Sequence, residues 1–193
     1  LPSHPHPSQV QPLKEILLPK ALTLLQSSLL QGVALRSLLQ FLGQLVAAKL
    51  PGCGFDELTT LLLNLPSSSA GGSSALNRHS LSALSQAVAS CCSKAEPSQA
   101  SKMVSTFAQQ LSSGGPGGSV LALLCLGEIG RLMDLSSTHA SLLKTVITSF
   151  DAPEEETRNA ASFALGNIAA GNLSAFVPTL LSTMESASAH DYL

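Results

Sequence analysis

The sequence predicts an all-α fold in which a pair of helices is repeated along the chain. Three observations support this prediction. The 193 residues are 45% hydrophobic but only 4% aromatic and 11% charged, and Leu, Ala and Ser dominate. This composition favours helices packed closely on helices, because strands would require more Val, Ile, Tyr and Thr. The other two observations are apolar residues spaced by three and four, and a recurring phrase of small residues.

The recurring phrase is found four times. Its copies are FLGQLVA (41–47), AVASCCS (87–93), CLGEIGR (125–131) and ALGNIAA (164–170). The third column of the alignment holds Gly43, Ala89, Gly127 and Gly166, at intervals of 46, 38 and 39 residues. A period near 40 residues with paired helices is typical of HEAT and armadillo repeats. Because Gly costs a helix about 1 kcal/mol relative to Ala, its recurrence predicts close helix packing at this column, with Ile129 and Ile168 in the core.

Each phrase is expected late in the second helix of a pair. The predicted helices span 13–28, 32–48, 55–64, 76–92, 98–111, 119–133, 138–150, 154–170 and 173–184. They form about four and a half pairs of an α–α superhelix over 13–187, with pairs at 13–48, 54–93, 97–133, 137–171 and a half pair at 173–187. A Pro-rich tail (1–12) is predicted to be disordered, and 188–193 are expected to form a frayed end.

The connector before the last full phrase carries a polar signal of its own. In FDAPEEE (150–156), Asp151 is predicted to cap the following helix, Pro153 to begin it, and the glutamates to balance its dipole. Asp151 and Arg158 could also each form charge-assisted contacts with neighbouring repeats. An ordinary cap with a solvated arginine is the alternative, and the sequence does not decide between the two.

The polar residues form no catalytic or metal-binding motif. The four cysteines lack Cys-x-x-Cys spacing, so we expect buried free thiols, although adjacent Cys91 and Cys92 are not expected to face one core together. The histidines are scattered without an i, i+4 partner. A net charge of −2 gives no electrostatic reason to expect nucleic acid or membrane binding, and no apolar run reaches the roughly 18 residues of a membrane span. We therefore expect no enzyme activity, cofactor, metal or small-molecule substrate.

Three stretches resemble a specific family. They are SSLLQGVALRSLLQFLGQLV (27–46), LALLCLGEIGRLMDLSS (121–137) and SFDAPEEETRNAASFALGNIAAGNLSAFVPTLL (149–181). They are similar to the central HEAT repeats of the cullin-associated, neddylation-dissociated family, also called the TATA-binding-protein-interacting family. The resemblance covers residues 13–185 and is weakest over 66–118. Since the family's solenoid is far longer, we expect the chain to be an internal fragment.

The resemblance implies a function that composition could not show. Members of this family wrap around cullin–RING ubiquitin ligases that lack the ubiquitin-like modifier, and they promote exchange of substrate-receptor modules without covalent chemistry. It implies a cullin–RING heterodimer as the partner, and a cytoplasmic and nuclear location. In HEAT solenoids the second helices line the concave face. The candidate contact residues on that face are Arg36, Gln40, Gln44, Arg78, Glu128, Arg131, Arg158 and Asn159.

One other function stays open. The chain could be a general HEAT scaffold with a different partner, such as part of a transport receptor or a phosphatase scaffold. An enzyme would require a deep polar pocket, for example one lined by His139 and the glutamates, and the sequence offers no such cluster. In either case a truncated array exposes an apolar end face, so we expect a tendency to self-associate.

Overall fold

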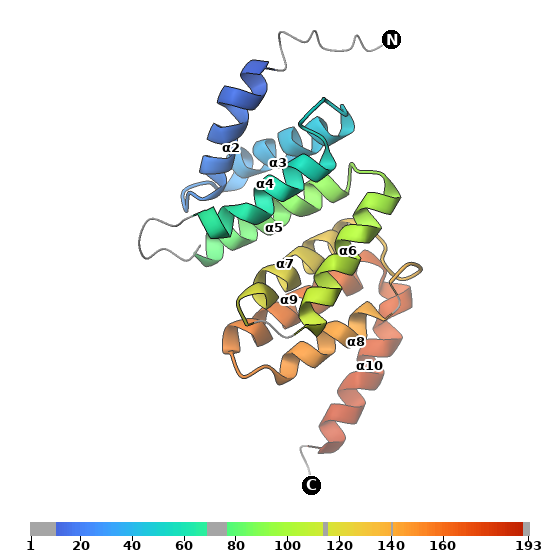
Figure 1. Cartoon of the computed structure of the whole chain (residues 1–193). Helices are drawn as coiled ribbons and strands as arrows, with labels where there is room; N and C mark the ends of the chain where they lie inside the picture. The colour runs from blue at the N-terminus through green and yellow to red at the C-terminus, as the bar shows by residue number, and fades with distance from the viewer. Residues whose placement is uncertain (1–10, 69–76, 114–115, 140, 191–193) are drawn as a thin grey trace. The chain divides into compact units, whose positions relative to one another are not determined.

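The computed structural model describes residues 11–68, 77–113, 116–139 and 141–190. The predictions for the two ends, at 1–10 and 191–193, and for parts of two loops concern residues outside these ranges. The described residues form helices and contain no strand (Figure 1), so the predicted all-α class is confirmed. The chain divides into two compact units, Leu1–Ala100 and Ser101–Leu193, called unit 1 and unit 2 below.

Unit 1 is built around α5. In order, the helices of unit 1 are the short π-helix η1 (Leu13–Leu17), α2 (Leu18–Leu25), α3 (Gly32–Ala47), α4 (Phe55–Ser68) and α5 (Arg78–Cys92). Helices α2, α3 and α4 all pack on α5. Asn77 begins α5, since its side-chain Oδ1 accepts a hydrogen bond of 2.8 Å from the Ser80 amide.

The burial of two adjacent cysteines on α5 corrects the sequence analysis. Cys91 and Cys92 are both fully buried, although they are adjacent on one helix. A helix with neighbours on several sides has more than one inward face, so two consecutive side chains can both be enclosed. Burial raises the pKa of each of these thiols to about 12. All four cysteines are buried free thiols, as expected.

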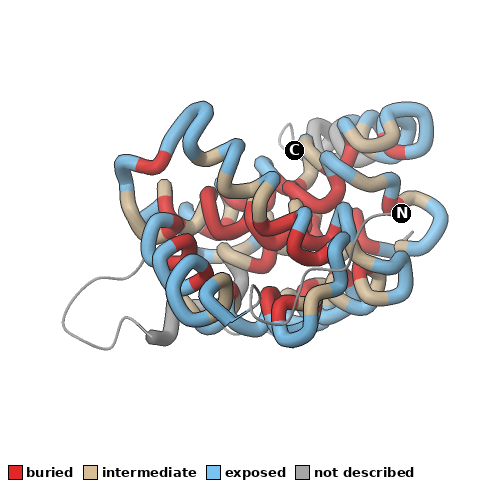
Figure 2. The backbone as a smooth tube through the Cα atoms, turned by 90° about the horizontal axis from the view of Figure 1, so that it is seen from above, coloured by how far each residue is buried: buried red, intermediate tan, exposed pale blue. Residues whose placement is uncertain are grey.

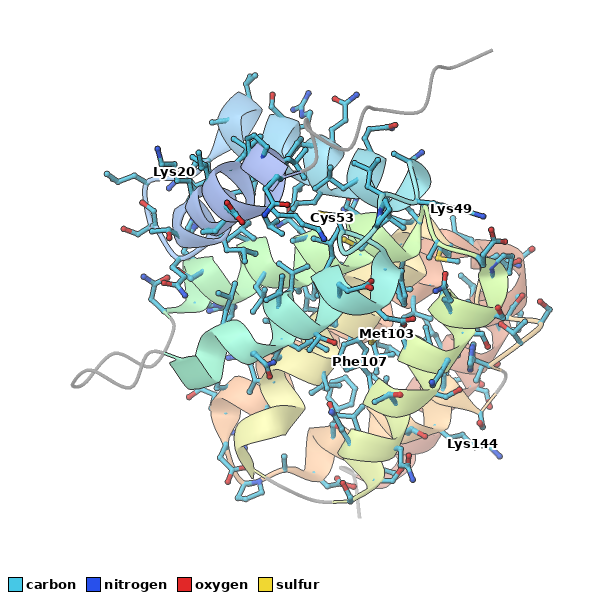
Figure 3. The ribbon with its side chains drawn as sticks, turned by 45° about the horizontal axis from the view of Figure 1, so that its top comes forward. Lys20, Lys49, Cys53, Met103, Phe107 and Lys144 are labelled. Carbon is cyan, nitrogen blue, oxygen red and sulfur yellow. The ribbon has the colours of Figure 1, made fainter. Side chains whose placement is uncertain are left out.

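Unit 2 is organised around the contact between α7 and α9. Helix α6 (Pro97–Ser112) begins at the end of unit 1. The helices that follow are α7 (Pro116–Leu132), α8 (Leu142–Ile147), the 3-10 helix η2 (Thr148–Asp151), α9 (Glu155–Gly171) and α10 (Leu173–His190). Helix α9 packs against α7, α8 and α10. Phe107 of α6, which Figure 3 labels, is buried. Along the helices of both units, buried and exposed positions alternate with the turns (Figure 2).

Helix α8 is shorter than predicted. The sequence predicts a helix over 138–150, but the α-helical part is Leu142–Ile147. Residues just before it form turns, because the His139 amide donates to the Leu135 carbonyl and the Leu142 amide donates to the His139 carbonyl. After Ile147 the chain tightens into η2. The apolar spacing therefore located the helix correctly but did not reveal the turns at either side.

Glycines allow close approach between α7 and α9. A Cβ at Gly127 would lie 2.9 Å from the Ala164 Cα, and a Cβ at Gly130 would lie 2.9 Å from the Ile168 Cα. In unit 1, a Cβ at Gly43 would lie 2.9 Å from the Ser90 Oγ on α5. Ala89, Ile129 and Ile168 are fully buried.

The expectation for Gly166 is wrong. This residue is exposed, and a Cβ placed on it would meet no atom within 4 Å. Gly43 and Gly127 are each covered by the second helix of the following pair, namely α5 and α9. Gly166 lies on α9 itself, and no such helix follows α9 among the described residues.

Candidate interaction surface

The polar residues predicted for partner contacts are divided by the structure into exposed and internal ones. Arg36, Gln40 and Gln44 are exposed on α3, while Arg78 is exposed at the start of α5 and Asn159 on α9. These side chains are available to a partner. They lie on α3, α5 and α9, the helices that were predicted to be the second of their pairs.

Glu128 does not belong to the exposed set, which corrects the sequence analysis. Its side chain lies on α7, and the residue is only 5% exposed. The Arg131 guanidinium holds it, with Nη2 2.6 Å and Nε 3.1 Å from the same carboxylate oxygen. Because Glu128 is buried and paired, its role is to fix Arg131 rather than to meet a partner directly. Arg131 itself stays partly exposed.

The charge-assisted contacts predicted for Asp151 and Arg158 with neighbouring repeats are not formed within the described part of the chain. The Arg158 guanidinium instead donates to the carbonyls of Ala152 and Pro153, at 2.8 and 2.7 Å. It thus closes the connector before its own helix and does not reach a neighbouring repeat. Asp151 lies in η2, and α9 begins at Glu155 without a side-chain cap, so the predicted capping role of Asp151 is also wrong.

Serines on α5 join neighbouring helix pairs in unit 1, which the sequence analysis missed. The Ser90 hydroxyl donates to the Leu39 carbonyl of α3 at 2.7 Å, and the Ser80 hydroxyl donates to the Gln26 carbonyl at 2.9 Å. The neighbouring His79 ring lies 3.0 Å from the Leu30 carbonyl. The only sequence signal for such contacts was the position of Ser90 beside Ala89 in the small-residue column.

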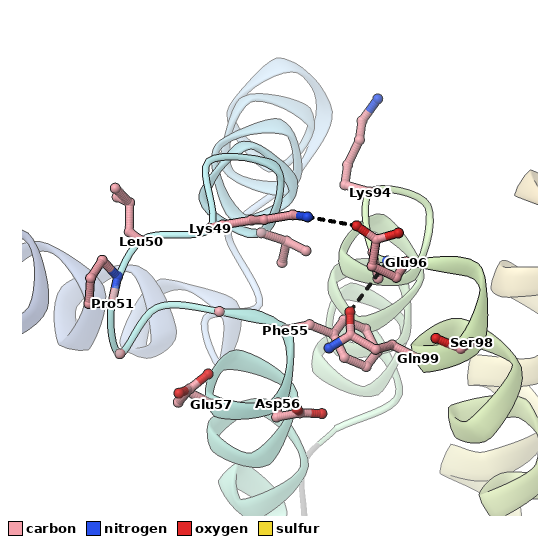
Figure 4. Close-up of a pocket in the computed structure, with 14 residues that line it drawn as sticks. Lys49, Leu50, Pro51, Phe55, Asp56, Glu57, Lys94, Glu96, Ser98 and Gln99 are labelled. Atoms are coloured by element: carbon pink, nitrogen blue, oxygen red, sulfur yellow. Dashed lines mark hydrogen bonds and ion pairs between the residues drawn. The ribbon is translucent and has the colours of Figure 1, made fainter. Parts of the chain in front are cut away.

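A groove in unit 1 lies where the α3–α4 and α5–α6 connectors meet. Its volume is about 500 Å³, and Val46, Leu50 and Phe55 contribute to its apolar lining. An ion pair of 2.7 Å joins Lys49 to Glu96 across it (Figure 4). The hydrogen bond and charge of Lys49 lower the pKa of Glu96, and Glu96 raises the pKa of Lys49 for the same reasons. Both side chains are largely exposed, so this pair is screened by salt and adds little to stability.

Unit 2 has its own polar link between repeats, centred on Asn172. Its Nδ2 donates to the Asp134 carboxylate at 2.9 Å and to the Ser136 hydroxyl at 3.2 Å. Its Oδ1 accepts from the Ala175 amide at 3.1 Å, which caps the start of α10. Hydrogen bonds from Ser136 and then from Asn172 hold the pKa of Asp134 below its usual range.

A serine and a histidine meet in unit 2, but the arrangement does not resemble a catalytic site. The Ser101 Oγ lies 3.1 Å from His139 Nε2, and partial burial lowers the pKa of His139. A nucleophile and base normally need a third group that orients the base, and the described residues show none at the other ring nitrogen. His139 does not line the groove described above. Within the described residues, no three His, Cys, Asp or Glu side chains gather closely enough to hold a metal ion.

Comparison with known proteins gives a consistent result. No family model matches the chain. Over 181 residues, or 91% of its length, the chain is 40% identical to the Arabidopsis thaliana protein named Cullin-associated NEDD8-dissociated protein 1. It is 34% identical to the Dictyostelium discoideum protein of the same name over 91% of the chain. It is 33% identical to Cullin-associated NEDD8-dissociated protein 2 of Mus musculus over 97% of the chain.

The chain is homologous to the cullin-associated NEDD8-dissociated proteins. The resemblance inferred from the repeat phrases is therefore confirmed. The chain spans 14–15% of the length of these three curated relatives. In addition, none of the helices within the described residues is long and apolar enough to span a bilayer.

Proposed function

We propose that this chain is a non-catalytic scaffold segment of a cullin–RING ligase regulator. The observation that carries the proposal is the homology to proteins named for cullin association, which extends over 91–97% of the chain. The packed helices and exposed polar residues agree with a binding role. In this role the segment acts in the cytoplasm and nucleus, and its partner is a cullin–RING heterodimer that lacks the ubiquitin-like modifier.

The mechanism follows from how helical repeats bind. Each repeat contributes a modest area, and the sum over many repeats forms an extended surface. Such a surface can exclude an adaptor or substrate-receptor module by steric overlap, so that exchange proceeds through altered dissociation rates. This segment contributes exposed groups on its second helices, notably Arg36 and Arg131. Burial of Glu128 beneath Arg131 restricts the guanidinium before any partner arrives, which lowers the entropy cost of binding.

Direct binding tests the proposal. The chain should bind a purified, unmodified cullin–RING heterodimer saturably in biolayer interferometry, and binding should be lost when the cullin carries NEDD8. Circular dichroism should show that the sample is helical, and light scattering should show whether it is monomeric. A folded chain that binds neither form of the heterodimer would contradict the cullin assignment for this segment. Equal binding to both forms would favour a scaffold whose partner choice does not depend on the modifier.

A further inference from the structure

Four exposed side chains form a line along α3, and we infer that this line binds an extended peptide segment with an acidic side chain next to an apolar one. We call Val33, Arg36, Gln40 and Gln44 the α3 row. The inference rests on the proposed scaffold function, because it names the chemistry of a segment that this scaffold would hold.

The row occupies a single face of α3. Successive residues of an α-helix are rotated by about 100°, so these four positions fall within an arc of roughly 80°. Leu42 lies on the opposite side of the helix and is fully buried. The buried residues Leu45 and Val46 flank Leu42, and buried Gly43 lies just outside the arc, about 20° beyond Arg36. The α3 row therefore faces solvent along the full length of the helix.

The side chains of the α3 row have no internal role among the described residues. Val33 is 75% exposed, and Leu29 just before the helix is 89% exposed, which makes them the two most exposed large apolar side chains described. Arg36 makes neither of the two ion pairs seen in the described chain. The side-chain amides of Gln40 and Gln44 make no hydrogen bond with the described residues. By contrast, the side-chain amide of Gln31 donates to the Ser28 carbonyl.

The spacing of the polar members matches an extended peptide. Arg36, Gln40 and Gln44 follow one another at four residues, or about 6 Å along the helix axis. Groups that face the same way in an extended chain repeat every two residues, or about 6.6 Å. A glutamine amide both donates and accepts, so it can pair with a peptide group. Two such amides in this register can bind two like-facing peptide groups of one strand.

The order of apolar, charged and amide side chains along the α3 row further defines the peptide segment that it would bind. Arg36 presents a planar guanidinium that binds a carboxylate through two parallel hydrogen bonds. Val33, about one turn before Arg36, and Leu29, which precedes the helix, offer apolar contact. From Val33 to Gln44 the row covers about 16 Å, which accommodates roughly five residues of extended chain. The complementary segment therefore has a large apolar side chain, a nearby Asp or Glu, and then backbone free to bond with the amides.

Selection from random peptides tests the inference. A phage-displayed library of random peptides is panned on the intact chain, and an enriched peptide is synthesised with a fluorescent label. We expect enriched sequences to place Asp or Glu close to a large apolar residue. In fluorescence polarisation, Arg36→Glu and the double change Gln40→Ala with Gln44→Ala should each weaken binding by about tenfold or more. Added salt should weaken binding to the unmodified chain.

A matched control separates a local effect from a change in net charge. Lys102→Glu makes the same charge reversal at an exposed position of α6 and should leave peptide binding unchanged. Circular dichroism should show the same helicity for all variants, since every change is on an exposed helical surface. Failure to enrich any peptide, or enriched peptides that bind Arg36→Glu as tightly as the unmodified chain, would overturn the inference.

The same proteins distinguish this inference from the proposed function. Cullin–RING binding is measured on the unmodified chain and on Arg36→Glu. Peptide binding without cullin binding would support the α3 row and contradict the proposed partner. Cullin binding without any peptide binding would overturn the row and leave the scaffold function standing.

Discussion

Replacing Gly130 by alanine should destabilise unit 2, whereas the same replacement at Gly166 should stabilise it. Both glycines lie inside helices, so alanine gains the same helix propensity, about 0.5–1 kcal/mol, at either position. The surroundings differ. At Gly166 the added methyl group enters open space, and the propensity gain is fully expressed.

At Gly130 the added methyl group would lie 2.6 Å from Ile168 Cγ1 and 2.9 Å from the Ile168 Cα. Rotating the Ile168 side chain cannot relieve the second collision, because the Cα belongs to the backbone of α9. The two helices must then move apart along a contact that is otherwise closely packed. Overpacking of this kind costs about 1–3 kcal/mol. Taken near its upper end and reduced by the propensity gain, it leaves a net loss of about 1–2 kcal/mol.

The two variants should therefore differ by about 2–3 kcal/mol, or roughly 10 °C in the melting temperature of a unit of this size. Thermal unfolding followed by circular dichroism at 222 nm measures the difference, and urea unfolding gives an independent estimate. Gly127→Ala should behave like Gly130→Ala, because its methyl group would meet the Ala164 Cα. If Gly130→Ala proved as stable as Gly166→Ala, the close approach of α7 and α9 would not be a packing constraint.

Two further predictions concern other parts of the molecule. Asn172→Ala removes the α10 cap and the link to Asp134, and should cost about 1 kcal/mol in urea unfolding, with Asn172→Asp as a variant that keeps the cap. In Asn172→Ala, NMR titration should show the pKa of Asp134 rising towards its ordinary value. Because this pKa is lowered in the folded protein, the stability that the Asp134 carboxylate contributes is present above its ordinary pKa. That stability is lost as the pH falls through the lowered pKa. The four buried thiols should not react with Ellman's reagent at pH 8 until denaturant is added, and early reaction of Cys91 or Cys92 would contradict their burial and their pKa of about 12.

The order of the helices and the family could be predicted from the sequence because both are encoded locally. Apolar spacing marks the inner face of each helix, and the phrase around Gly127 marks where two helices approach closely. The error at Gly166 arises from treating every copy of the phrase as equivalent. A small residue indicates close packing only when a helix covers it, and the identity of the covering helix is a property of the neighbouring repeat.

The candidate contacts were harder to predict because a charged residue does not reveal its partner. Glu128 and Arg158 look available in the sequence, yet one pairs with Arg131 and the other binds carbonyls in its own connector. Conversely, Ser90 looks unremarkable but bonds to the Leu39 carbonyl of a neighbouring helix. A serine that donates to a backbone carbonyl leaves little trace in the sequence, because every residue offers the same carbonyl acceptor whatever its side chain is.

In unit 1, the exposed polar side chains and the polar side chains that join helices are different residues. Binding and stability can therefore be changed separately. Besides its apolar core, unit 1 is joined by small residues and by hydroxyl groups that donate to carbonyls, as at Gly43, Ser80 and Ser90. The α3 row takes no part in these contacts, so its side chains can change without a loss of packing. Residues that hold no helices together can change to suit a partner. Replacing Ser90, in contrast, would alter the close contact with Gly43. We therefore expect Ser90→Val to lower the melting temperature of the chain while Gln40→Ala leaves it unchanged, and the opposite ranking would mean that the α3 row is part of the fold.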